Sequence, residues 1–102
     1  MPDEFRSNWD LSSFARDAAA VFKKAGLTTN EHIHKIQEEA GEVSKAWLKE
    51  TDRRILDECM DVILAAAVTV ASLGASVEEE LPKAIATQRA RRSIYGSGID
   101  TD

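Results

Sequence analysis

Four carboxylates occur as two pairs with the same spacing, and this pattern is the clearest chemical signal in the chain. Glu39 and Glu42 form the first pair, and Glu58 and Asp61 form the second. Residues three apart are neighbours on a helix surface, so each pair presents two oxygen ligands together. A set of four oxygen donors suits a hard cation such as Mg²⁺, with Mn²⁺ as the alternative. A di-iron centre would need a Glu-x-x-His motif on each of two helices, and this sequence has that spacing only once, at Glu31 and His34.

The second pair makes the stronger case for a metal. Glu58 and Asp61 begin a stretch that otherwise has the composition of a protein core, and burial of a lone carboxylate is costly. Carboxylates pressed together repel one another unless a cation lies among them. The alternative is that all four carboxylates serve only in salt bridges. The bases available for such salt bridges are Lys35, Lys45, Arg53 and Arg54.

Four helices are predicted to position these residues, and no strand pattern is present. The first starts near Ser7 or Asn8 and ends at Lys24 or Ala25, before Gly26. The second follows a Thr28–Glu31 capping box and runs to about Lys49. The third is capped by Thr51 or Asp52 and runs to about Leu73, before Gly74. The fourth continues to Tyr95; Ser76 and Glu79 have capping-box spacing, but Pro82 favours a start nearer Glu80.

Apolar spacing predicts how these helices pack. On the second helix one seam is predicted to face the core, formed by Ile33, Ile36, Ala40, Val43 and Trp47. This places Glu39 at the edge of the buried face and Glu42 further round. The third helix is apolar on every side after Asp61, which is more surface than three short partners can cover. We therefore expect an all-α four-helix bundle that a homodimer or homotetramer completes.

Composition narrows the class of protein. The chain has 102 residues and a net charge of −5. Its length predicts one domain, over residues 1–95, followed by a tail over residues 96–102. The acidic balance argues against general binding of nucleic acid. The longest uncharged run, Val62 to Val77, is too short and too polar to span a bilayer comfortably. A cytoplasmic protein with no membrane partner is the expectation.

Several other residues are candidates for contact with a ligand. Lys35, one turn before Glu39, and Arg89 and Arg92 on the last helix are candidates to bind phosphate. His32 lies two turns before Glu39 at a similar angle, although a partly exposed surface histidine is the commoner case. Gly41, which has no side chain, leaves room for a close neighbour or a ligand.

For the aromatic residues and the cysteine, ordinary packing is the alternative to a role in ligand binding or catalysis. Trp47 is expected in the core or in an interface between copies, with stacking on a base as the less common role. Trp9 and Phe14 can line a base pocket or simply pack as an amphipathic stripe. Cys59 has no activating neighbour in sequence, so an inert buried thiol is expected.

Two segments resemble the MazG-like family of all-α nucleoside triphosphate pyrophosphohydrolases. They are Ile36-Gln37-Glu38-Glu39-Ala40-Gly41-Glu42-Val43 and Glu58-Cys59-Met60-Asp61-Val62-Ile63-Leu64. The resemblance continues through Leu81-Pro82 into the basic last helix and covers about residues 33–95. Many relatives carry Lys and Asn in that helix where Gln88 and Arg92 stand here.

This resemblance implies an enzyme that uses Mg²⁺ to hydrolyse an NTP or dNTP to the monophosphate and pyrophosphate, in nucleotide-pool house-cleaning. Carried over by motif, the metal ligands are Glu39, Glu42, Glu58 and Asp61, and Glu38 supports them or helps to activate water. A phosphoribosyl-ATP pyrophosphohydrolase is the alternative within this class. A non-catalytic dimeric helical module that binds a protein partner is the alternative outside it. An enzyme requires carboxylates that converge on an open cleft, whereas a module leaves them paired or scattered.

Overall fold

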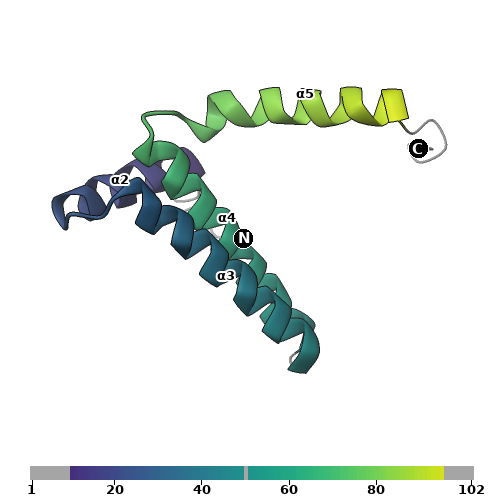
Figure 1. The fold of residues 1–102 in the computed structure, drawn as a ribbon, viewed down its shortest axis with the longest axis horizontal. Helices are drawn as coiled ribbons and strands as arrows, with labels where there is room; N and C mark the ends of the chain where they lie inside the picture. The colour runs from purple at the N-terminus through teal and green to yellow at the C-terminus, as the bar shows by residue number, and fades with distance from the viewer. Residues whose placement is uncertain (1–9, 50, 96–102) are drawn as a thin grey trace, which may run out of the picture.

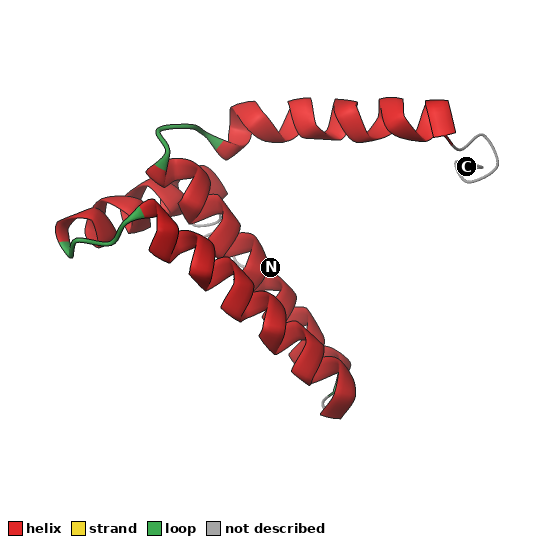
Figure 2. Ribbon diagram, in the orientation of Figure 1, coloured by secondary structure: helices red, strands yellow, loops and turns green. Residues whose placement is uncertain are grey.

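A computed structural model describes residues 10–49 and 51–95; the side chains of Lys49 and of residues 92–95 lie outside that description. These residues form four helices and no strand, which confirms the predicted all-α class (Figure 2). The helices are α2 (Leu11–Lys24), α3 (Thr29–Lys49), α4 (Asp52–Ser72) and α5 (Val77–Tyr95). The predicted tail over residues 96–102 lies outside the described residues.

An antiparallel pair of long helices forms the centre of the fold. Helices α3 and α4 lie side by side, α2 packs across one end of the pair, and α5 runs away from it (Figure 1). The core is small and consists of Ala15, Ala46, Ala67 and Val68. Because three of these four side chains are single methyl groups, the helix backbones can approach closely. This close approach brings the facing polar residues of α3 and α4 within reach of one another.

The helix ends follow local capping chemistry. The Asp10 carboxylate accepts a hydrogen bond of 3.1 Å from the Ser13 N–H, so the N-cap of α2 is Asp10. The predicted start near Ser7 or Asn8 is therefore wrong, and those two residues lie outside the described residues. The glycines after α2 and α4 adopt positive φ angles of 87° and 80°, as their expected role as terminators requires.

The start of α5 also differs from the prediction. The helix begins at Val77, because the Ser76 carbonyl already accepts hydrogen bonds from the N–H groups of Glu79 and Glu80, at 3.2 and 2.9 Å. Pro82 consequently lies inside the helix and not at its first position. A proline there removes one N–H donor, and the helix tolerates this loss close to its start.

The apolar seam predicted for α3 does not face the core. The side chains of Ile33 and Trp47 are 43% and 74% exposed, whereas His32 and Ala46 are buried. Helical spacing identifies which residues share a face, but it does not say what that face packs against. Trp47 is therefore not a core residue of this chain, and an interface between copies and stacking on a base are the two roles that remain.

Helix α4 is likewise not covered on every side by its own chain. Leu56, Met60 and Ile63 recur at helical spacing and remain about half exposed. A Cβ atom added at Gly41 of α3 would meet no atom within 4 Å, so no close neighbour in the described chain explains that glycine. No single described helix has the length and apolarity of a membrane span; by the same criteria α4 and α5 pass only together, across a 112° bend.

The predicted capping box forms at the start of α3 and gives a pH-dependent contribution to stability. Glu31 accepts hydrogen bonds from the N–H and the hydroxyl of Thr28, at 3.0 and 3.1 Å. These bonds, the one from the backbone first, hold the pKa of Glu31 below its ordinary 4.5. Because the folded-state pKa is depressed, this stabilisation is present above about pH 5 and is lost as the pH falls through the lowered value.

We expect Glu31→Gln to lower the unfolding temperature at neutral pH and to match the parent in acid, since glutamine imitates the protonated carboxyl. Thermal unfolding followed by circular dichroism, from neutral pH down to about pH 3, measures the difference. Glu78→Gln is the control, because Glu78 is exposed and makes no ion pair within the described helices. A Glu31→Gln difference of equal size at every pH would contradict this account.

Candidate metal centre

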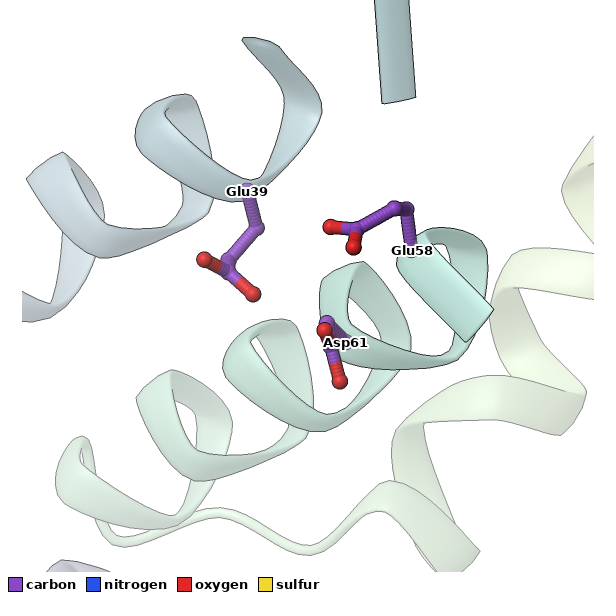
Figure 3. Close-up of side chains that lie close together, drawn as sticks. All are labelled: Glu39, Glu58 and Asp61. Atoms are coloured by element: carbon purple, nitrogen blue, oxygen red, sulfur yellow. The ribbon is translucent and has the colours of Figure 1, made fainter. Parts of the chain in front are cut away.

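Three of the four predicted ligands converge between α3 and α4. One carboxylate oxygen each of Glu39, Glu58 and Asp61 lies within 4.8 Å of the other two. Figure 3 shows the side chains of Glu39 from α3 and Glu58 from α4 extending into the space between the two helices, with Asp61 near Glu58 on α4. The two-helix arrangement is what brings residues far apart in sequence into one cluster. We call these three residues the acidic triad.

Two of the three residues of the acidic triad are largely buried, and the triad carries an excess of negative charge. The Glu58 and Glu39 side chains are only 11% and 14% exposed, whereas Asp61 is an exposed residue. Arg54 lies 3.3 Å from Glu58, and Lys35 lies 3.5 Å from Glu39. Asp61 makes no ion pair within the described part of the chain. Two cations against three carboxylates leave one excess negative charge, and an oxygen-only donor set of this kind fits Mg²⁺.

The acidic triad opens on a cavity of about 540 Å³. Glu39 and Asp61 line one part of its wall together with Lys35. The remaining wall is largely apolar and comes from α2, α4 and the start of α3. An accessible cavity beside converging carboxylates is the arrangement expected of an enzyme site and not of solvated helix charges.

The other two predicted acidic residues lie outside the triad. Glu42 is 42% exposed and lies 3.4 Å from Lys45, so it follows the salt-bridge pattern in this structure. Glu38 is 65% exposed and lies 3.1 Å from Lys35. The hydrogen bond to Glu38, and then the charge of Glu39, raise the pKa of the Lys35 ammonium. Lys35 therefore bridges Glu38 to the triad and remains positively charged beside the cavity.

The predicted substrate-binding residues are divided by the fold. His32 is 5% exposed and lines the same cavity, so the description of it as a partly exposed surface histidine is wrong. Arg89 lies exposed on α5, which runs away from the α3–α4 pair (Figure 1). Arg92 belongs to the same helix, but its side chain lies outside the described part. Cys59 is a free, half-buried thiol.

Sequence reasoning underestimated the contribution of α2 to the cavity. Phe14, Ala18 and Phe22 all line it, although only Phe14 of these three was considered above for a base pocket, with an amphipathic stripe as the alternative. Their spacing of four residues was the available signal, because it places all three on one face of a helix. Trp9, the other aromatic considered for that pocket, lies outside the described residues.

The fold and the site together define a helical protein with a cluster of three carboxylates beside a ligand-sized cavity. Residues 15–87, more than half of the chain, match the family model of phosphoribosyl-ATP pyrophosphohydrolases. The chain belongs to this family, which is part of the MazG-like superfamily of all-α pyrophosphohydrolases and whose members hydrolyse phosphoric anhydride bonds. Neither a curated protein nor a solved structure gives a significant match.

The acidic triad predicts that charge repulsion destabilises the metal-free protein. We expect Asp61→Asn to unfold at a higher temperature than the parent without metal, because one of three close negative charges is removed. We expect the parent, but not Asp61→Asn, to be stabilised by Mg²⁺, by about 2.7 kcal/mol at a hundredfold excess over its dissociation constant. Thermal unfolding across a Mg²⁺ titration measures both effects.

Asp57→Asn is the matched control for that experiment. Asp57 lies one turn before Asp61 on α4, and its carboxylate pairs with Arg53 at 2.9 Å and not with the triad. The Asp57→Asn protein should keep the full response to Mg²⁺. An equal response in the Asp61→Asn protein would exclude Asp61 as a ligand.

Proposed function

We propose that this chain is a Mg²⁺-dependent phosphoribosyl-ATP pyrophosphohydrolase, an enzyme of histidine biosynthesis. The match to the family model favours this activity over the broader cleavage of NTPs and dNTPs that the sequence motif first indicated. The observation that carries the proposal is the convergence of Glu39, Glu58 and Asp61, two of which, Glu39 and Asp61, line an accessible cavity. A partner-binding module would have no use for three carboxylates brought together at that cavity.

The proposed reaction is hydrolysis of the anhydride between the α- and β-phosphates. The oxygen of water forms a bond to the α-phosphorus, the bond from that phosphorus to the bridging oxygen breaks, and that oxygen leaves as part of pyrophosphate. A proton of the water is released. The products are phosphoribosyl-AMP and pyrophosphate, and no oxidant or second substrate is required.

Each polar residue of the site has a role in this proposal. Glu39, Glu58 and Asp61 hold Mg²⁺, which supplies positive charge to the phosphate oxygens when it is bound. Glu42 lies one turn from Glu39 and joins the ligand set if it releases Lys45. Lys35 contributes positive charge to the pyrophosphate that leaves. Glu38 positions Lys35 through their 3.1 Å contact, and in this way supports the site without belonging to the triad.

Product analysis tests the proposal. The parent protein is incubated with phosphoribosyl-ATP and with a panel of NTPs and dNTPs, in Mg²⁺ or in EDTA. We expect phosphoribosyl-AMP and pyrophosphate in Mg²⁺ only, with phosphoribosyl-ATP as the best substrate. Glu39→Gln and Asp61→Asn should each lower kcat by at least about a hundredfold, as removal of a group that stabilises transition-state charge does elsewhere.

Glu80→Gln is the control for those two variants, because Glu80 is exposed on α5 and pairs with Lys83. It should keep the parent rate. Release of orthophosphate in place of pyrophosphate would put the attack at another phosphorus and would overturn the proposal. Preference for an ordinary NTP would favour the broader hydrolysis of NTPs and dNTPs over the hydrolysis of phosphoribosyl-ATP.

The same proposal includes a second copy of the chain. Leu56, Met60 and Ile63 form an apolar stripe along α4 that is about half exposed in one chain. Burying apolar surface contributes about 25 cal/mol per Å², so such a stripe favours association. Arg89 lies on α5, which leads away from the α3–α4 pair of its own chain (Figure 1), so in this proposal it serves the site of a second copy; Arg92 belongs to the same helix. The location of this protein in the cytoplasm remains a prediction from its sequence.

Light scattering measures this assembly. We expect a mass of two or four chains for the parent and a single-chain mass for Ile63→Glu, because a buried unpaired charge destabilises an interface by several kcal/mol. Val21→Glu is the control, since Val21 is 63% exposed and belongs to α2, not to the α4 stripe. A single-chain mass for the parent protein would contradict the proposed assembly of two or four chains.

A further inference from the structure

The cavity beside the acidic triad has a second, apolar part that the metal chemistry does not use. Phe14, Ala18 and Phe22 of α2 form one wall, and Leu64 and Val68 of α4 form the other. The whole cavity, with its polar and apolar parts, has a volume of about 540 Å³, which lies in the range of sites for small molecules. A triphosphate is a polyanion and gains nothing from apolar walls. This part of the cavity therefore suits a flat, weakly polar group.

His32 provides one polar group in this apolar surrounding. Its ring is 5% exposed and contacts the Phe22 ring edge-to-face at a centroid distance of 5.6 Å. No hydrogen bond to the imidazole is present within the described residues. A neutral imidazole carries one donor and one acceptor, and buried polar groups almost always find partners. Because His32 lines the cavity and makes no hydrogen bond within the described residues, its imidazole is available to a ligand bound there.

We propose that this apolar part of the cavity binds the purine base of the nucleotide, stacked on Phe14 and hydrogen-bonded at its edge by His32. The proposal rests on the proposed function, because the triad and Lys35 fix where the phosphates lie. In a nucleotide the base lies one ribose away from the α-phosphate. Glu39 and Asp61 line the same cavity as Phe14 and His32, so one nucleotide occupies both parts at once.

Binding of adenosine tests the base site without metal or hydrolysis. The chain has only two histidines, so His34→Gln leaves a single imidazole signal to follow by NMR. We expect adenosine to shift the His32 signal and ribose at the same concentration to leave it unchanged. The Phe14→Ala protein should lose the shift. An unchanged His32 signal in adenosine would overturn the proposal.

Kinetics provide a second test that does not depend on spectroscopy. Phe14→Ala and His32→Gln should each raise KM for phosphoribosyl-ATP about tenfold and leave kcat nearly unchanged, a loss typical of one base–aromatic contact. Val21→Ala and His34→Gln are the controls, since both residues are exposed and neither lines the cavity. Because Phe14 is 48% exposed, its variant remains informative even if the buried His32 does not tolerate substitution.

The two proposals fail in different ways. Hydrolysis with parent KM values in both variants would overturn the base site and leave the enzymatic activity in place. A His32 shift in adenosine without any hydrolysis would support the base site and overturn the proposed reaction. Parent KM values together with a His32 shift in adenosine would place adenosine binding outside the catalytic complex and would overturn the proposal in its present form.

Discussion

The rest of the structure depends on the constraint that three negative charges lie within 4.8 Å of one another between two helices. Like charges at such distances repel, and the repulsion is strong where water is scarce. The fold must therefore hold α3 and α4 together against this repulsion. Lys35 and Arg54 offset part of it, and the excess charge that remains is what makes the site suitable for a divalent cation.

The helix pair meets this constraint with a very small core. Alanine methyl groups at Ala46 and Ala67 permit close packing, and the capped helix ends determine where each carboxylate lies along its helix. Helix α2 then closes one end of the pair and supplies the aromatic wall of the cavity. The triad consequently comes from α3 and α4 and the apolar part of the cavity from α2 and α4, while His32 and Lys35 at the start of α3 also line the cavity.

Because the core is so small, much apolar surface remains exposed on the outside of one chain. Trp47 and Leu48 are each 74% exposed, and α5 runs away from the other described helices (Figure 1). Soluble single-chain domains rarely expose such apolar surface without a function for it. The interior between the helices is small and partly polar, so many apolar side chains are not buried within one chain. This exposed apolar surface is the physical reason for including a second copy in the proposed function.

The sequence by itself determined the local features. Capping residues and glycines predicted the bounds of α3 and α4, and the three-residue spacing predicted which carboxylates share a face, since both depend only on near neighbours along the chain. The tertiary structure decided what each face meets. It turned Ile33 and Trp47 outward, buried His32, left Glu42 with Lys45 and directed α5 away from the site. Helical periodicity carries no information about which of several apolar faces finds a partner, because that choice depends on packing between residues distant in sequence.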